Sequence, residues 1–436
     1  MNFLLNSYQN LLETAAPALD LLLQRRLAHG KEDASRLDER KGRASIPRPD
    51  GKLIWLHGAS VGEAQSTLIL IEQLRARFPE ITILLTTGTV TSARYMAQRL
   101  PEGVIHQYYP VDRPRWVRDF LTHWQPDFVL WMESELWPVM LCALQERSTP
   151  AALLNARMSP RSLSRWQIVP ETARLLLQTF TAILAQTETD AQSFRTLGAT
   201  SVHVTGNLKY AAAALPVNGD DLETLRGKAD HRPRWVYAST HAGEEEMACR
   251  LHRSLAQDIP GLLTIIVPRH PARRDEIINN CKDYGVTIQQ RGDGKSPPAE
   301  GTGIYLADTL GELGLFYRFA PVACIGRSFS NDGGGGHNPI EAAQLGCAVI
   351  HGPHIQNLQS IYDDMNAADA ALCVRDEDDF RHILKILLTD PAQCEKHSRA
   401  GQQFIKTQGD ILTRIMNDIV PLAETALGRK AQNHDL

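Results

Sequence analysis

Short apolar runs alternate with amphipathic helical patterns through most of the chain. In the first half, the runs that predict buried strands cover residues 52–57, 81–86, 104–109, 128–132 and 151–154. The helices expected between them cover residues 63–77, 91–99, 114–123 and 138–145. Continuous apolar strands that alternate with helices are typical of a parallel sheet covered on both faces. This half therefore predicts a doubly wound α/β domain.

The alternation stops at residues 211–230, which are small, polar and rich in proline and glycine, and then starts again. The second set of strands is expected at residues 235–238, 262–267, 286–289, 303–307, 322–325 and 348–351, with helices ending at 255 and covering 274–284 and 339–345. We divide the chain into an N-terminal segment 1–50, a domain 51–212, a linker 213–230 and a domain 231–436 that includes C-terminal helices. The fold class is α/β, with two doubly wound Rossmann-like domains facing a cleft and ligands at the carboxyl ends of the strands.

Residues 1–24 form an apolar pattern at helical spacing, with Glu13 and Asp20 as the only charges. The next stretch, residues 25–52, holds nine Lys and Arg against five Asp and Glu. An apolar helix followed by a basic collar could lie in a membrane surface and meet anionic head groups. The alternative is a helix that packs on the body of the protein. No run is long enough for a conventional spanning helix.

Composition excludes several classes. The chain has 436 residues, 43% of them hydrophobic and 22% charged, which is typical of a globular protein with two domains. A net charge of −4 argues against nucleic acid as a partner. The seven cysteines include no Cys-x-x-Cys pair, which excludes a disulfide framework and suits a reducing cytoplasm. The histidines and acids show no metal-ligand spacing, so no metal is expected.

Glu63 ends the turn His57-Gly-Ala-Ser-Val-Gly-Glu63, between a predicted strand and a predicted helix. The glycines of this turn allow a ligand to approach the backbone closely. A carboxylate at this position could act as a general base. The alternative is that it only stabilises the start of the helix.

Two more acids follow the next strand toward the same edge. Glu133 and Glu135 come directly after residues 128–132, so we expect them close to Glu63. Charges at a buried strand end are costly unless they are paired. Lys209 and Arg157 also follow apolar runs and are the expected cations.

In the second half, Arg269 follows the strand 262–267, and its guanidinium fork is suited to a phosphate. It could equally be an ordinary arginine of a surface loop. Gly311 also follows a strand and could expose backbone groups to a base or a phosphate. A helix capped by Asp308 explains that pattern as well.

Four consecutive glycines, residues 333–336, predict a loop with exposed N–H groups. The residues that follow fit a helix start, with Asn338 as N-cap and Pro339 at the first position, and such a start attracts anions. Glu341 could accept hydrogen bonds from ribose hydroxyls or complete a capping box. No Gly-Lys-Ser/Thr follows, so the loop is not a P-loop.

These candidate motifs, taken in their order along the chain, resemble those of a known family. The sequence is similar to the transferases of 3-deoxy-D-manno-octulosonic acid (Kdo), which are glycosyltransferases of the GT-B fold that attach Kdo to lipid A precursor. The resemblance rests on RLDERKG (36–42), SVGE (60–63), MESELWP (132–138), NAR (155–157), TGNLK (205–209), STH (239–241), GEEE (243–246), VPRHP (267–271), ADTLGEL (307–313) and GGHNPIE (335–341). Each motif alone is weak, but their order and spacing together are specific.

The resemblance implies that Glu63 is the general base and that Glu133 and Lys209 assist the transition state. It implies an acceptor-binding first domain and a second domain that binds the donor CMP-Kdo. The substrate-binding residues that follow from it are Ser60, Gly62, Glu135, Arg157, Pro268, Arg269, Leu310, Gly311, Glu312, Gly335, Gly336, Asn338, Pro339, Ile340 and Glu341.

An inverting transfer to lipid IVA without metal or cofactor is expected, in lipopolysaccharide core biosynthesis at the cytoplasmic side of the inner membrane. Residues 1–50 would then associate with that membrane surface, in a peripheral or monotopic way. Two rival functions stay open on the residues alone. One is another GT-B enzyme, such as a UDP-sugar transferase or an epimerase. The other is a membrane-bound nucleotide-binding protein without turnover, which would not need Glu63.

Overall fold

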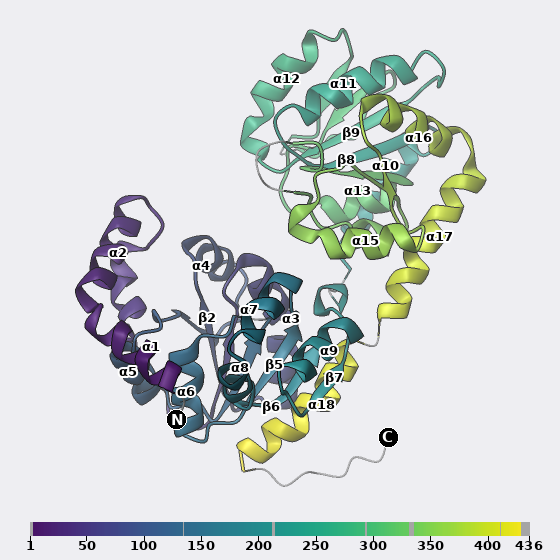
Figure 1. Cartoon of the computed structure of the whole chain (residues 1–436). Helices are drawn as coiled ribbons and strands as arrows, with labels where there is room; N and C mark the ends of the chain where they lie inside the picture. The colour runs from purple at the N-terminus through teal and green to yellow at the C-terminus, as the bar shows by residue number, and fades with distance from the viewer. Residues whose placement is uncertain are drawn as a thin grey trace. The chain divides into compact units, whose positions relative to one another are not determined.

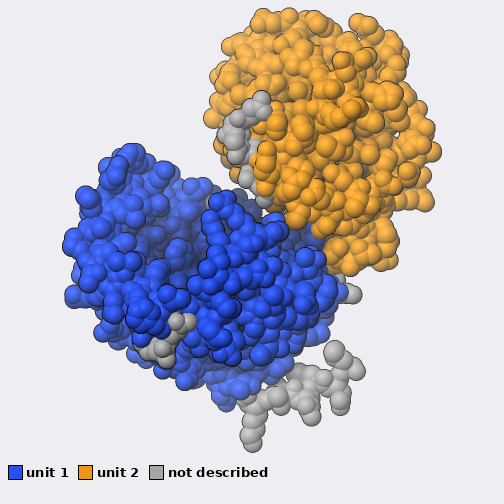
Figure 2. Space-filling model, in the orientation of Figure 1, with its two compact units in different colours: residues 1–212, 410–436 blue, residues 213–409 orange. Residues whose placement is uncertain are grey.

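The computed structural model describes residues 3–133, 135–211, 214–292, 294–330, 335–409 and 411–428. The chain forms two compact units, unit 1 from residues 1–212 and 410–436 and unit 2 from residues 213–409 (Figure 2). Each unit contains a seven-stranded sheet in which every paired strand is parallel, with helices between the strands (Figure 1). The prediction of two doubly wound α/β domains is confirmed.

Unit 1 has the strand order β3-β2-β1-β4-β5-β6-β7. Its strands are β1 (Leu53–His57), β2 (Thr82–Thr87), β3 (Ile105–Tyr108), β4 (Phe128–Met132), β5 (Ala151–Ala156), β6 (Phe180–Ala185) and β7 (Val202–Val204). Its helices are α1 (Phe3–Thr14), α2 (Ala16–Ala28), η1 (Ala34–Lys41), α3 (Val61–Arg77), α4 (Val90–Ala97), α5 (Pro114–Trp124), α6 (Pro138–Glu146), α7 (Pro160–Gln167), α8 (Pro170–Leu177), α9 (Glu188–Thr196), η2 (Leu208–Ala211) and α18 (Ile411–Ala426). The order reverses at β1 and β4, and ligands of open α/β sheets bind at such a switch point.

Unit 2 has the order β10-β11-β9-β8-β12-β13-β14, and its switch point lies between β8 and β12. Its strands are β8 (Arg234–Thr240), β9 (Leu263–Pro268), β10 (Ile288–Gln290), β11 (Ile304–Leu306), β12 (Val322–Ile325), β13 (Ala348–His351) and β14 (Leu372–Cys373). Its helices are α10 (Gly219–Ala229), α11 (Glu244–Leu255), η3 (Pro271–Arg273), α12 (Arg274–Lys282), α13 (Leu313–Phe319), α14 (Ile340–Gln344), η4 (Gln356–Leu358), α15 (Gln359–Ala367), α16 (Glu377–Thr389) and α17 (Pro391–Gln408).

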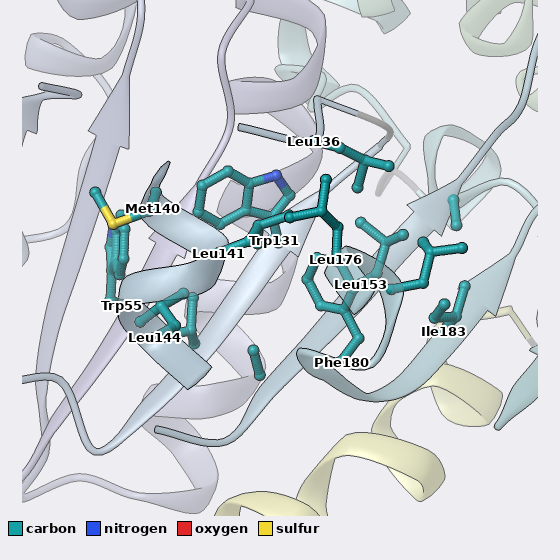
Figure 3. Close-up of a cluster of buried hydrophobic side chains, with 14 of the residues drawn as sticks. Trp55, Trp131, Leu136, Met140, Leu141, Leu144, Leu153, Leu176, Phe180 and Ile183 are labelled. Atoms are coloured by element: carbon teal, nitrogen blue, oxygen red, sulfur yellow. The ribbon is translucent and has the colours of Figure 1, made fainter. Parts of the chain in front are cut away.

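The first strand of each unit carries a buried tryptophan with the same hydrogen-bond partner. Trp55 Nε1 donates to Thr86 Oγ1 and Trp235 Nε1 donates to Thr264 Oγ1, each at 2.9 Å. In unit 1, the Trp55 ring packs edge-on against Trp131 of β4, within the apolar cluster of Figure 3. A buried indole N–H needs an acceptor, so the threonine lets a large ring fill the core without an unsatisfied donor.

Two segments differ from the predicted domain limits. Helix α18, expected in the second domain, belongs to unit 1 and lies beside β7 (Figure 1). Its Ile411, Ile415 and Ile419 are fully buried, and its Asp418 bonds His203 at 2.9 Å. The predicted linker 213–230 contains helix α10, whose apolar residues are buried in unit 2. Small polar composition marked the segment as a linker, but an Asn cap and three spaced apolar residues are sufficient for a short helix.

Helix α1 packs on unit 1 through one face only. Leu5 is buried, and Glu13 accepts hydrogen bonds from Arg113 NH2 (2.9 Å) and from the backbone N–H of Arg115 (3.3 Å). Apolar side chains on the remaining surface of α1 and α2 are exposed: Phe3 (80%), Leu4, Leu11, Leu21 and Leu22. The alternative of a helix packed on the body is thus confirmed for one face, whereas membrane contact through the exposed face stays a prediction. Among the described residues, none of the helices combines the length and apolar character needed to cross a membrane.

The motif RLDERKG (36–42) attaches η1 to the edge of the first sheet. Glu39, which is buried, accepts two hydrogen bonds from Arg36 and one from the backbone N–H of Tyr108. Gly42 then ends the helix with φ = 78°, a left-handed conformation that favours glycine. A β-carbon at this position would overlap the carbonyl oxygen of Trp116. The motif is therefore structural, and it sets the path of the chain into β1.

We predict that Gly42→Ala destabilises unit 1 by more than about 2 kcal/mol, because it adds a backbone clash to an unfavourable φ. Gly103→Ala is the matched control, since its φ is also left-handed (85°) but no atom lies within 4 Å of the added carbon. Its expected loss is roughly 1 kcal/mol. Denaturant unfolding of both variants measures the difference. Equal losses would contradict the packing argument.

Candidate active site

Glu63 is held at the start of α3 by a reciprocal set of hydrogen bonds. Ser60 is the N-cap and accepts the backbone N–H of Glu63 (3.3 Å). In return, the Glu63 carboxylate accepts the Ser60 hydroxyl (2.7 Å) and the backbone N–H of Ala59 (2.8 Å). The hydrogen bonds of Glu63 thus confirm that it stabilises the start of the helix. The contacts also fix the carboxylate at the carboxyl end of β1, at the switch point of the sheet.

The charge environment makes Glu63 unusual for a capping residue. It is 7% exposed, and burial raises the pKa of its carboxyl to about 7, with the negative charge of Glu133 as the next cause. The hydrogen bonds from Ser60 and Ala59 act in the opposite direction. A carboxylate with a pKa near neutrality is suited to accept a proton from a substrate.

Glu133 and Lys209 meet beside this carboxylate. Glu133 follows β4 with φ = 56°, and its Oε1 lies 3.3 Å from Lys209 Nζ. A β-carbon at Gly62 would lie 4.0 Å from the same Nζ, so the amine faces the first turn of α3. Unit 1 therefore brings Glu63, Glu133 and Lys209 together, as the sequence predicted from their positions after strands.

Glu135 and Arg157 are more exposed than Glu63, and the negative charge of Glu135 contributes to the raised pKa of Glu63. Glu135 is exposed, and its Oε2 accepts the indole N–H of Trp137 (3.0 Å). Arg157 is also exposed, directly after β5. Ser134, between the two acids of its motif, lies outside the described residues. The expected pairing of acids with cations is found for Glu133 and Lys209.

Sequence reasoning missed the residue that positions Lys209. Asn155, the second-to-last residue of β5, is fully buried with φ = 52°, and its Oδ1 accepts the backbone N–H of Leu208 at 2.9 Å. Asn207 Oδ1 accepts the backbone N–H of Lys209 itself (3.1 Å). Asparagine tolerates left-handed φ, which was the available signal in the motif NAR.

In unit 2, Arg269 directly follows the end of β9. Pro268 is the last residue of that strand and is buried, whereas Arg269 is exposed and its backbone N–H donates to Thr240 O at 3.0 Å. The strand end is thus tied to β8, next to the switch point. Partial burial raises the pKa of Glu341, while the hydrogen bond from Asn338 and the charge of Arg269 act against the rise. The positive charge of Arg269 therefore acts on Glu341 of the segment 338–341.

In the segment 310–312, the first two residues are accessible, whereas the side chain of the third is hydrogen-bonded. Leu310 is 80% exposed, and Gly311 has φ = 80° with open space around it. Glu312 instead receives two hydrogen bonds from the buried Arg291 (2.7 and 2.9 Å) and one from Thr309. Burial acts to raise its pKa, but these bonds and the charge of Arg291 lower it to about 2. Arg291 was missed, although it follows a strand as the other candidates do.

The prediction of an exposed glycine loop is wrong for its described half. Gly335 and Gly336 are buried, and the Gly336 N–H donates to Arg327 O at 3.0 Å. A β-carbon on Gly336 would approach the Tyr362 ring to 2.9 Å, so this glycine permits close packing. Gly333 and Gly334 lie outside the described residues.

The helix expected at 339–345 is also shorter than predicted. It is α14, which has five residues, and Pro339 precedes it as its N-cap instead of forming its first position. Asn338 still caps the first turn, because its Oδ1 accepts the backbone N–H of Ile340 (3.1 Å) and its Nδ2 donates to Glu341 Oε1 (3.2 Å). Throughout the described ranges, no group of three or more His, Cys, Asp or Glu could hold a metal ion.

Comparison with solved structures shows the class of fold. The UDP-GlcNAc 2-epimerase from Neisseria meningitidis bound to UDP-GlcNAc matches 84% of this chain over its whole length, with a TM-score of 0.54 and 16% identity. A second UDP-N-acetylglucosamine 2-epimerase gives the same TM-score over 89% of the chain at 14% identity. At such identities the likeness concerns the fold alone, a two-domain α/β architecture of the GT-B type.

Comparison with sequences shows the family. Residues 35–212 match the family model described as 3-deoxy-D-manno-octulosonic-acid transferase. A probable mitochondrial 3-deoxy-D-manno-octulosonic acid transferase of Arabidopsis thaliana is 33% identical over 99% of this chain and 98% of its own length. The 3-deoxy-D-manno-octulosonic acid transferase of Rickettsia felis is 36% identical over 84% of this chain and 78% of its own. The chain belongs to the family of 3-deoxy-D-manno-octulosonic acid transferases, which are glycosyltransferases.

The raised pKa of Glu63 predicts a pH-dependent gain of stability in Glu63→Gln. The folded protein holds the proton up to about pH 7, whereas the unfolded chain loses it near 4.5. Wild-type stability due to this group is therefore full below pH 4.5 and is lost as the pH rises through 7. Relative to wild type, the variant should gain up to roughly 3 kcal/mol between pH 5 and pH 8.

Denaturant unfolding at pH 5 and pH 8 measures this change. Glu72→Gln, on the exposed side of the same helix, is the control and should follow the wild type at both pH values. If the stability of Glu63→Gln relative to wild type is the same at both pH values, the pKa of the Glu63 carboxyl is not raised in the folded protein.

Proposed function

We propose that the protein transfers Kdo from CMP-Kdo to the lipid A precursor lipid IVA, with inversion at the anomeric carbon and without a metal ion, in lipopolysaccharide biosynthesis. Family membership supports the donor sugar and the class of reaction. The observation that carries the proposal is the Glu63 carboxylate, fixed at the switch point with a pKa of about 7.

In this proposal, Glu63 accepts the proton of the acceptor sugar hydroxyl as that hydroxyl attacks. The pKa of about 7 leaves a large fraction of the group ionised at neutral pH and still basic enough to take the proton. Lys209 supplies a positive charge at the same edge of unit 1, and Glu133 holds its amine in place at 3.3 Å. The carboxylate of the donor sugar is the group that such a cation stabilises.

Unit 2 binds the CMP moiety in the same proposal. Arg269 contacts the phosphate through its guanidinium fork, and Pro268 shapes the strand end before it. Leu310 and Gly311 offer open backbone to the nucleotide, and Asn338, Pro339, Ile340 and Glu341 form the opposite side. Because the Glu312 carboxylate is saturated by Arg291, its contribution is to position residues 310–311. Buried Gly335 and Gly336 likewise position the segment that follows them.

The leaving group explains why no metal is required. CMP departs with a single phosphate, and a nearby arginine can stabilise its developing charge. A divalent cation is needed most where two adjacent phosphates must be neutralised together. The transfer is therefore expected to continue in the presence of a chelator.

We predict that Glu63→Gln lowers Kdo transfer by roughly a hundredfold or more while CMP binding stays unchanged, since only the general base is removed. Mass spectrometry of lipid IVA after incubation with CMP-Kdo and a chelator measures the product. Glu72→Gln is the matched control. Near-normal transfer by Glu63→Gln would show that Glu63 is not the general base.

The same experiment tests the two rival functions. If wild type binds CMP but forms no Kdo product, a binding protein without turnover is the better description. Protection against thermal unfolding by UDP instead of CMP would favour another GT-B enzyme.

We also propose that the exposed apolar side chains of α1 and α2 insert into the cytoplasmic face of the inner membrane, where the acceptor resides. The exposed set is Phe3, Leu4, Leu11, Leu21 and Leu22. The basic residues that follow, which include Arg25 and Arg26 in the last turn of α2, add attraction to anionic lipids. Since Glu13 and Leu5 tie α1 to unit 1, this attachment is monotopic and leaves the body of the protein at the surface.

We predict that the combined variant Phe3→Ser, Leu11→Ser, Leu21→Ser and Leu22→Ser binds anionic vesicles roughly a hundredfold more weakly, because the inserted apolar area is lost. These side chains are exposed, so the fold should persist. Flotation with vesicles at low and high salt measures binding. The control is Ile168→Ser, which removes another apolar side chain of unit 1 that is 79% exposed. Equal flotation of both variants would place the membrane contact elsewhere.

A further inference from the structure

Arg291 of unit 2 is buried, and it pairs with a residue of the loop 308–312, part of which the proposed function assigns to the donor. The Arg291 side chain is 1% exposed, and its backbone N–H donates to Leu306 O of β11 at 2.9 Å. Its guanidinium donates to both carboxylate oxygens of Glu312, through Nε at 2.7 Å and through NH2 at 2.9 Å. A bidentate pair of this kind fixes the direction of the carboxylate as well as its distance.

The segment that contains Arg291 also holds the other end of the loop 308–312. Asp308 is buried, and its Oδ1 accepts the backbone N–H of Gly292 at 2.8 Å. Arg291 and Gly292 are neighbours in the sequence, and their partners Glu312 and Asp308 are the last and the first residues of the loop. The loop is thus attached at both ends to one segment of the chain.

The residues between these two attachments are only weakly held by packing. Leu310 is 80% exposed, and Gly311 has φ = 80° with no atom within 4 Å of an added β-carbon. A glycine in open space can adopt many backbone conformations, and restricting it to one costs conformational entropy. The conformation of residues 310–311 therefore depends mainly on the attachments at the two ends of the loop.

The charges around Arg291 balance one another. Its NH2 lies 3.5 Å from Asp221 Oδ2 of helix α10, and its NH1 donates to the hydroxyl of Tyr305 at 3.3 Å. Lys295 reaches both acids, because its Nζ lies 3.1 Å from Asp221 Oδ2 and 3.2 Å from Glu312 Oε1. Two cations and two acids thus pair within this cluster. The cluster is therefore suited to holding the loop and not to binding an ion from solution.

We propose that Arg291 is a positioning residue for the donor nucleotide, which acts through Glu312 to hold residues 310–311 in the backbone conformation that CMP requires. The inference rests on the proposed function, in which residues 310–311 contact CMP. Arg291 does not touch the donor itself. It reduces the number of conformations that the free loop must give up when the nucleotide binds.

An ion pair that only stabilises unit 2 differs in its effects from one that positions the loop. Loss of a stabilising pair lowers the free energy of unfolding and leaves the affinity of the folded protein for CMP unchanged. Loss of a positioning pair also lowers the fraction of folded molecules whose loop is ready to bind, and the apparent Kd rises as that fraction falls. Affinity and unfolding must therefore be measured on the same variants.

We predict that Arg291→Met raises the Kd for CMP about tenfold in calorimetric titration of the full chain, as expected if the loop is ready in roughly one molecule in ten. In Kdo transfer, KM for CMP-Kdo should rise by a similar factor. The kcat and the KM for the acceptor should stay unchanged, because the reacting groups of unit 1 are intact. Arg291→Lys should lie between this variant and wild type, since its amine can still hold one oxygen of Glu312.

The double variant Arg291→Met, Glu312→Gln separates positioning from stability. It leaves Lys295 and Asp221 as a balanced pair, so its free energy of unfolding should be closer to wild type than that of Arg291→Met. CMP should still bind about tenfold more weakly than to wild type, because the attachment is missing. The loss should not reach about a hundredfold, because both substitutions break the same contact.

Arg250→Met is the matched control. Arg250 donates to both oxygens of Glu377 and to the hydroxyl of Tyr284 at 3.3 Å, which are the same kinds of partner, but it joins α11 to α16. Its CMP affinity should equal that of wild type. Wild-type affinity in Arg291→Met and Arg291→Lys, or affinity that recovers with stability in the double variant, would overturn this inference and leave the donor site in place. If wild type does not bind CMP, the proposed donor itself is wrong.

Discussion

Unit 1 is organised around a carboxylate that is buried next to a second negative charge. Glu63 loses hydration at the end of β1, and Glu133 adds repulsion, so the ionised form is disfavoured by both effects. Two hydrogen bonds from the turn before α3 limit this penalty, and they also prevent the side chain from moving into solvent. The same contacts that cap the helix therefore keep the group both basic and in place. One geometry thus provides the observed cap and supports the proposed role of Glu63 as a general base.

The partner of this arrangement is Lys209, and its position depends on buried amides. The lysine lies on η2, a short 3₁₀ turn that could not hold a side chain by itself. Asn155, at the end of a central strand, bonds the backbone directly before the lysine. A central strand thus fixes the backbone next to Lys209, although the two segments are far apart in the sequence. Unit 2 uses the same principle with Glu244, a buried acid that accepts backbone N–H groups from the loops after β8 and β12.

Sequence patterns predicted the strands around each switch point well, because these strands are continuous apolar runs buried on both faces. Strands β6 and β7 and helices α7, α8 and α9 were not predicted. Helix α18 was assigned to the wrong domain, since its apolar face does not say which unit covers it. Among the residues that follow strands, the sequence analysis selected charged ones as candidates, such as Glu63 and Arg269. Asn155 and Arg291 were missed because their roles lie in contacts with segments remote in sequence.

The run of glycines shows why local pattern is ambiguous about function. A glycine is required where φ is left-handed, where a ligand approaches the backbone, or where another part of the chain packs against it. These needs look alike in sequence, and only the last applies to Gly335, whose contact is with Gln356. The backbone N–H of Gly336 already donates to Arg327 O, so it cannot also hold a phosphate. If unit 2 binds CMP as proposed, side chains such as Arg269 must then meet the negative charge of the phosphate.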